Sequence, residues 1–208
     1  MDFAGASILL VTLSPVMLVI GLLIRVRMGT GVFFRQVRPG LGEQPFQMVK
    51  FRTMSEERDS DGGLAPDRER ITRLGRILRA TSLDELPQLV NILRGEMSFV
   101  GPRPLLTEYL PYYSAEERRR HTVLPGITGL AQVSGRNLLS WDDRLRRDVE
   151  YVERLSFRLD LWILWRTVVD ALMARGVAVD TSQVEGNLAQ QRMQKEYNSG
   201  GGDDATDD

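Results

Sequence analysis

The chain has 208 residues, of which 42% are hydrophobic, and a formal net charge of -1. This length and apolar content suffice for one hydrophobic core, so a single domain with appendages is expected. The absence of cysteine excludes disulfides, thiolate metal ligands and cysteine nucleophiles within the chain. A basic block at residues 25–52 follows an apolar segment. No basic run interleaved with aromatic residues follows it, so a membrane surface is favoured as a partner over nucleic acid.

The apolar segment runs from Phe3 to Ile24 without a charge, which is long enough for a transmembrane helix of roughly 20 residues. Ser14 and Pro15 lie at its midpoint. Pro15 lacks a backbone donor and its ring clashes with the carbonyl of Val11, so a kink is predicted there. The kinked helix can span the bilayer, or it can dip into one leaflet and return. In the second case the basic flank makes the side of both ends cytoplasmic.

Residues 31–54 contain two β-rich stretches separated by the turn sequence at 39–43, which predicts a β-hairpin. Lys50 and Arg52 fall on the same face of the second strand, because side chains alternate along a strand. Two cations on one face suit a phosphate group, although solvated charges are the simpler interpretation. Residues 55–67 are rich in Ser, Asp and Gly and are expected to form a loop.

Two adjacent carboxylates, Asp84 and Glu85, lie near the start of the stretch at residues 81–104. Ser82 followed three residues later by Glu85 is typical of a capping box and predicts the start of a helix. A helix N-terminus has unpaired N–H groups and a positive dipole end, which keep carboxylates ionised and attract phosphate. An ionised Asp84 beside a phosphate could act as a nucleophile or hold a metal. From spacing alone, a purely structural cap is the commoner case.

Two arginines flank this carboxylate pair in the sequence. Arg79 ends a helix predicted at residues 68–80, within reach of an anion bound at the next helix start. Arg103 stands between Pro102 and Pro104, after a short strand predicted at residues 97–100. The two prolines restrict its backbone, so its side chain starts partly positioned for a nucleotide phosphate. A surface arginine in a turn is the alternative.

The second half of the chain is predicted to be mainly helical. Ala131–Val133 is interpreted as a short strand after a turn-rich passage, and further capping boxes begin at Ser114 and Ser140. A helix predicted at Phe157–Arg175 is rich in aromatic residues, which suits either a bilayer interface or ordinary core packing. Periodicity fades after Ser182, and the end of the chain is expected to be disordered.

Several motifs follow one another in a fixed order: Ser14-Pro15, KFRTM at 50–54, SLDELPQ at 82–88, GPRP at 101–104, and PGITG at 125–129 through GRN at 135–137. In these motifs, over about residues 10–180, the chain resembles the bacterial monotopic phosphoglycosyl transferases. The resemblance implies an α+β, mostly helical fold with a short β-hairpin and interfacial amphipathic helices. It implies a re-entrant membrane helix broken at Ser14-Pro15 (residues 1–28), a small cytoplasmic catalytic domain (29–183) and a largely disordered acidic tail (184–208).

The resemblance also implies a reaction. Asp84 would attack the β-phosphate of a UDP-sugar and expel UMP, and undecaprenyl phosphate would then take the phosphosugar from the enzyme in the first membrane step of glycoconjugate synthesis. Mg²⁺ would bridge the diphosphate and Asp84, while Glu85 would orient Asp84, ligate the metal or assist the acceptor. Contacts to phosphate or uridine would come from basic residues: Lys50, Arg52, Arg79, Arg103 and Arg136.

The same resemblance places the enzyme in the bacterial inner membrane, in contact with the lipids of one leaflet and with its catalytic domain on the cytoplasmic face. A homodimer stays open, because the aromatic helix could face lipid or a second copy. The sequence does not name the sugar. Two other functions compete: a membrane-bound phosphohydrolase that uses an aspartyl phosphate, and a lipid-surface adaptor whose capping boxes are only structural.

Overall fold

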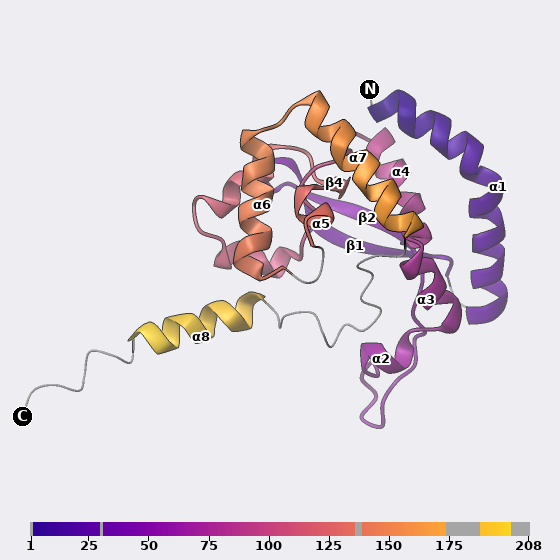
Figure 1. Cartoon of the computed structure of the whole chain (residues 1–208). Coiled ribbons are helices and arrows are strands. Elements are labelled where there is room, and N and C mark those ends of the chain that lie inside the picture. Colours follow the sequence, from indigo (N-terminus) through magenta and orange to yellow (C-terminus); the bar gives the residue numbers. More distant parts are fainter. Residues whose placement is uncertain (1, 30, 136–138, 174–187, 201–208) are drawn as a thin grey trace, which may run out of the picture.

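The computed structural model describes residues 2–29, 31–135, 139–173 and 188–200 (Figure 1). Its described part is mostly helical with one two-stranded hairpin and one short parallel strand pair, which confirms the predicted class. The elements are α1 (Asp2–Met28), β1 (Phe33–Pro39), η1 (Leu41–Glu43), β2 (Pro45–Phe51), α2 (Asp67–Arg70), α3 (Arg73–Ala80), η2 (Leu83–Gln88), α4 (Leu89–Leu93), β3 (Ser98–Val100), η3 (Thr107–Tyr112), η4 (Glu117–Thr122), β4 (Gly126–Thr128), α5 (Leu130–Val133), α6 (Trp141–Glu153), α7 (Phe157–Leu172) and α8 (Leu188–Gly200), where η denotes a 3₁₀ helix.

Helix α1 bends partway along its length and wraps around one side of the body (Figure 1). Pro15 lies inside it, and the Ser14 hydroxyl donates to the carbonyl of Val11 at 2.8 Å. Ser14 thus supplies a donor to the carbonyl that Pro15 cannot pair, which keeps the helix continuous through the predicted break. Among the described residues, α1 is the one helix long and apolar enough to cross a membrane. Its re-entrant topology stays a prediction.

The predicted β-hairpin is confirmed, with β1 and β2 antiparallel from the pair Phe33 and Phe51 to the pair Pro39 and Pro45. Strand β2 is paired along its other edge by the side chain of Asn91. Asn91 of α4, which is fully buried, accepts from the Val49 N–H at 3.1 Å and donates to the Gln47 carbonyl at 2.7 Å. These contacts satisfy strand groups that would otherwise be buried without a partner, and they fix α4 against β2.

The single helix predicted at residues 68–80 is wrong, because the structure has two short helices, α2 and α3, at that position. Thr72 is extended between them and caps α3 by accepting from the Gly75 N–H at 2.9 Å. The Thr72 N–H donates to the carbonyl of Thr53, just beyond β2. A Cβ on Gly75 would lie 2.0 Å from that carbonyl. Glycine therefore allows α3 to pack directly on the chain that leaves β2.

The strand predicted at Ala131–Val133 is also wrong, since these residues belong to helix α5. The strand lies earlier, in the turn-rich passage, where β4 pairs in parallel with β3. A three-residue strand gives too short a pattern to separate it from a helical turn. A Cβ on Gly126 would lie 2.2 Å from the Gly101 nitrogen, so the close approach of the two strands requires glycine.

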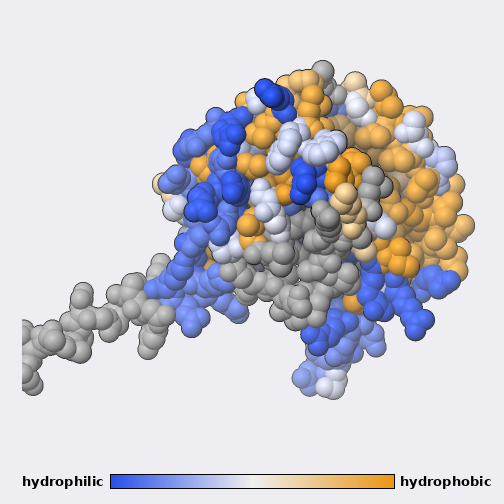
Figure 2. All heavy atoms as spheres, viewed as in Figure 1, coloured by the Kyte–Doolittle hydropathy of each residue, from blue (hydrophilic) through white to orange (hydrophobic). Residues whose placement is uncertain are grey.

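The capping boxes at Ser114 and Ser140 are confirmed, because each serine oxygen accepts from the N–H three residues on. The first box closes the turn that leads into the 3₁₀ helix η4, whose own N-cap residue is Glu116, and the second caps α6. Helix α7 is also confirmed as far as Leu172, while the predicted end at Arg175 lies outside the described residues. Several large apolar side chains on it are exposed: Phe157, Leu161, Trp162, Trp165 and Val168. Their exposure favours the interfacial interpretation over core packing. Figure 2 shows hydrophobic residues covering the side that carries α1, with hydrophilic residues around α6 and α8.

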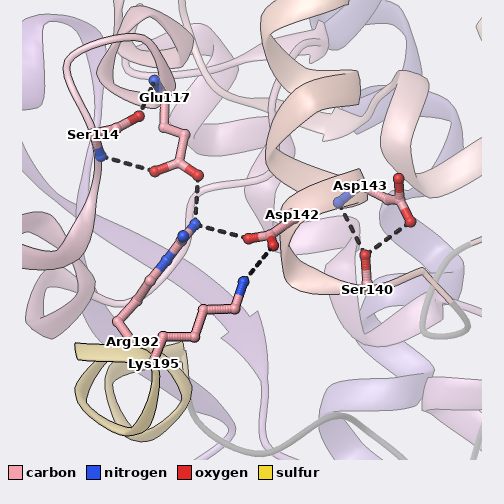
Figure 3. A network of polar contacts seen from close by, with 7 residues as sticks. All are labelled: Ser114, Glu117, Ser140, Asp142, Asp143, Arg192 and Lys195. Atoms are coloured by element: carbon pink, nitrogen blue, oxygen red, sulfur yellow. Dashed lines mark hydrogen bonds and ion pairs between the residues drawn. The ribbon is translucent and has the colours of Figure 1, made fainter. Parts of the chain in front are cut away.

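Residues 188–200 of the predicted disordered tail form helix α8. Leu188 is buried in a core cluster with side chains from η3 and α6. Ion pairs add to this attachment (Figure 3): Arg192 contacts the carboxylates of Glu117 and Asp142, and Lys195 reaches Asp142 at 2.6 Å. Because these partners lie far away in the sequence, local periodicity could not predict the helix.

Candidate active site

The two adjacent carboxylates lie in η2, which packs against β2 and α3. The predicted capping box at Ser82 is wrong. Ser82 is left-handed, with φ of 57°, and its side chain caps no N–H. The Glu85 carboxylate turns instead toward charged donors, which bind it more strongly than a backbone N–H would. The chain at Asp84 is a 3₁₀ helix and not the predicted start of an α-helix.

Glu85 is the anchor of the site. Its Oε1 accepts from Lys50 Nζ at 2.7 Å and from Arg103 Nη2 at 2.6 Å, and its side chain is 13% exposed. Burial alone would raise the pKa of Glu85, but the charges of Arg103 and Lys50 outweigh it and lower that pKa to about 2. Glu85 therefore stays ionised at neutral pH and joins a strand residue to the GPRP turn.

Asp84 has a different environment although it is the next residue. It is 8% exposed, and within the described part of the chain no hydrogen bond or ion pair engages its carboxylate. Burial, followed by the charge of Glu85, raises the pKa of Asp84 to about 6, while Lys50, Arg103 and Arg79 act in the opposite direction. The carboxylate is thus ionised at neutral pH, more basic than an ordinary aspartate, and available to a ligand.

The predicted basic residues divide into two sets. Lys50, Arg79 and Arg103 come together around the carboxylates, and Arg79 is held by a hydrogen bond of 3.0 Å from its Nε to the buried hydroxyl of Thr53. Arg52 points elsewhere and forms an ion pair with Glu56. The remaining candidate, Arg136, lies outside the described residues.

Sequence reasoning missed Arg38, at the end of β1. Burial, followed by the charge of Arg103, lowers the pKa of Arg38 to about 10. Its Nη2 donates to Gln36 at 2.7 Å, and its buried Nε has no hydrogen-bond partner in the structure as described. The only local signal in the sequence is its place before Pro39. Lys50, Arg79 and Arg103 already outnumber the two carboxylates, and Arg38 adds a further cation beside Arg103, which suits an anionic ligand such as a phosphate.

The donor set fits a magnesium ion that arrives with a phosphate ligand. Over the described residues, no three His, Asp or Glu side chains are grouped so that they could hold a metal. Mg²⁺ is commonly bound by one or two carboxylates together with substrate phosphates. Asp84 has its carboxylate unengaged, whereas one oxygen of Glu85 already accepts from two cations. Asp84 is therefore the better placed ligand of the two.

Comparison with known proteins gives the family. The model of the family "Bacterial sugar transferase" matches residues 1–174. A Bacillus subtilis (strain 168) protein named uncharacterized sugar transferase EpsL is 51% identical, over 85% of this chain and 87% of the relative. The UDP-glucose:undecaprenyl-phosphate glucose-1-phosphate transferase of Caulobacter vibrioides is 42% identical, over 83% and 68%. The exopolysaccharide production protein ExoY of Rhizobium meliloti is 38% identical, over 84% and 85%. This chain is therefore an enzyme of the bacterial sugar transferase family.

Proposed function

We propose that this protein transfers a sugar-1-phosphate from a UDP-sugar to undecaprenyl phosphate through a phosphosugar covalently bound to Asp84. The observation that carries the proposal is the contrast within the carboxylate pair. Asp84 is buried, its carboxylate has no hydrogen bond or ion pair with another described residue, and its pKa is raised. Glu85, in contrast, is held by ion pairs with Lys50 and Arg103. Two carboxylates whose environments separate their pKa values are typical of a site that gives them different roles. The activity named for the Caulobacter relative supports the choice of substrates.

In the first step an Asp84 oxygen attacks the β-phosphorus of the UDP-sugar. A bond forms between that oxygen and phosphorus, the bond from phosphorus to the bridging oxygen breaks, and UMP leaves with the electron pair. In the second step an oxygen of undecaprenyl phosphate attacks the same phosphorus. The bond to Asp84 breaks, the carboxylate is restored, and the product is an undecaprenyl diphosphate sugar.

The surrounding cations neutralise the phosphoryl oxygens in both steps. Lys50 and Arg103 are already held in place by Glu85, and Arg79 is held by Thr53, so they need little rearrangement when the charge develops. Asp84 would hold Mg²⁺ together with the substrate, and the ion would supply further charge neutralisation. Glu85 acts in this scheme by holding two cations and by keeping the pKa of Asp84 high.

Incubation of the enzyme with a UDP-sugar in the absence of acceptor tests this reaction against hydrolysis. We expect a burst of UMP equal to the amount of enzyme, followed by no further release until undecaprenyl phosphate is added. A panel of UDP-glucose and UDP-linked N-acetylated sugars is needed because the sugar is unassigned. Continuous UMP release without acceptor would contradict transfer and favour the phosphohydrolase.

We further propose that α1 enters one leaflet of the bacterial inner membrane and returns, so that the body lies on the cytoplasmic face. The bend of α1, its exposed apolar residues and the exposed aromatic residues of α7 support this topology. In intact spheroplasts, a cysteine added before Met1 should resist a membrane-impermeant thiol reagent, as should one added after Asp208. Both should react once the membrane is permeabilised. Labelling of the N-terminal cysteine alone in intact spheroplasts would establish a spanning helix.

A further inference from the structure

A buried ion pair links α6 to the GPRP turn. Arg120 of η4 has a side chain that is 1% exposed, and that of Asp148 in α6 is 3% exposed. The Asp148 Oδ2 accepts from Arg120 Nη2 at 2.7 Å and from Nε at 3.0 Å. The guanidinium also lies over the Tyr113 ring, 5.6 Å from its centroid. Neither Arg120 nor Asp148 is among the charged groups that shift the pKa of Asp84.

One contact of Arg120 points toward the active site. Its Nη2 donates to the backbone carbonyl of Arg103 at 2.6 Å. Arg103 stands between Pro102 and Pro104, which have no N–H, so the turn has few donors of its own to fix its shape. The Gly126 N–H fixes the Pro102 carbonyl at 3.0 Å, and Arg120 fixes the next carbonyl.

We propose that Arg120, itself held by Asp148, is a positioning residue that sets the backbone of Arg103 and so keeps the Arg103 guanidinium on Glu85, beside the phosphate of the substrate. The statement about the phosphate rests on the proposed function. The stability of the fold does not by itself explain why this ion pair is present, because hydrophobic residues of similar volume can often replace a buried ion pair without loss of stability. Binding the Asp148 carboxylate and the Arg103 carbonyl at the same time requires the several donors of a planar guanidinium, which arginine has and lysine lacks.

The double variant R120M/D148L separates positioning from stability. It removes both charges together, so no buried charge remains unpaired, and the introduced methionine keeps an apolar side chain on the Tyr113 ring. We expect a melting temperature within about 3 °C of the wild type and a kcat lower by on the order of 10- to 100-fold, with a smaller change in KM for the UDP-sugar. The matched control is R119M/E153L, which removes a neighbouring half-exposed pair and should leave kcat unchanged.

A second variant covers the case in which the double variant does not fold. R120K keeps the charge beside Asp148 but cannot reach both acceptors, so it should show the same loss of kcat. Normal kcat in a folded double variant, or in R120K if the double variant is unfolded, would overturn the proposal and leave Arg120 with a structural role only.

Hydrogen–deuterium exchange gives a readout that does not depend on activity. The amides of Gly101 and Gly126, which donate to the carbonyls of Thr128 and Pro102 beside the turn, should exchange faster in R120M/D148L than in the wild type or the control variant. Unchanged exchange would overturn the positioning role even if activity fell. If the wild type itself released no UMP with any UDP-sugar, the proposed function would fail, while the exchange result would still decide whether Arg120 fixes the turn.

Discussion

The variant Asp84→Asn is expected to lose sugar-phosphate transfer and, at the same time, to be more stable than the wild type at pH 8. Transfer is lost because the amide cannot act as the nucleophile. Stability rises because burial and the charge of Glu85 raise the pKa of Asp84 from 3.8 to about 6. Ionising this side chain in the folded protein therefore costs on the order of 3 kcal/mol relative to the unfolded chain.

The pH dependence of this gain follows from the same pKa. Below pH 3.8 Asp84 is protonated in both states, so the variant and the wild type should have equal stability. The wild type loses stability between about pH 4 and pH 6, and the difference is then constant at higher pH. Urea unfolding in detergent at several pH values measures this difference in the free energy of unfolding. The variant Asp61→Asn, in the exposed loop, is the control. A variant less stable than the wild type at pH 8 would contradict the assigned environment.

The neighbouring variant Glu85→Gln is expected to have the opposite effect on stability. Lys50 and Arg103 hold the pKa of Glu85 at about 2 against an ordinary value of 4.5, so the ionised carboxylate contributes on the order of 3 kcal/mol at neutral pH. Glutamine leaves both cations without their counter-charge, which is most destabilising for Lys50 because its side chain is only 16% exposed. Activity should fall as well, because Lys50 and Arg103 lose their common anchor.

Because the folded pKa of Glu85 is lowered, its contribution is present above pH 4.5 and is lost as the pH falls toward 2. Urea unfolding of Glu85→Gln at pH 7 should therefore show a large loss of stability. The control Glu153→Gln removes a carboxylate that pairs with Arg119 at 2.8 Å where both side chains are about half exposed, and it should cost less than about 1 kcal/mol. Equal losses in the two variants would show that Glu85 does not anchor the site.

The sequence predicted the elements that local patterns determine. Two β-rich stretches around a turn gave the hairpin, the capping box at Ser140 gave α6, and the apolar, aromatic-rich stretch from Phe157 gave α7. The prediction failed where distant partners decide the local structure. Glu85 fits a capping box by spacing, but Lys50 and Arg103, which are 35 and 18 residues away, take its carboxylate. Thr72 interrupts a helical pattern because it pairs with Thr53.

The candidate site shows the same limit. Motif order placed Asp84, Glu85, Lys50, Arg79 and Arg103 in one group, and the structure brings these five together. Motif order did not reveal that Arg52 pairs with Glu56. Arg52 lies beyond the end of β2, where the alternation of side chains along a strand no longer applies. Arg120 also has no distinguishing local pattern. Its importance comes from a hydrogen bond to a carbonyl 17 residues away.

Mass spectrometry of the intact protein after incubation with a panel of UDP-sugars, without acceptor, is a direct test of the covalent intermediate on Asp84. We expect a mass increase equal to one sugar phosphate, located on Asp84 by fragmentation, removed by undecaprenyl phosphate and absent from Asp84→Asn. An adduct on another residue, or full transfer by the Asp84→Asn variant, would contradict it.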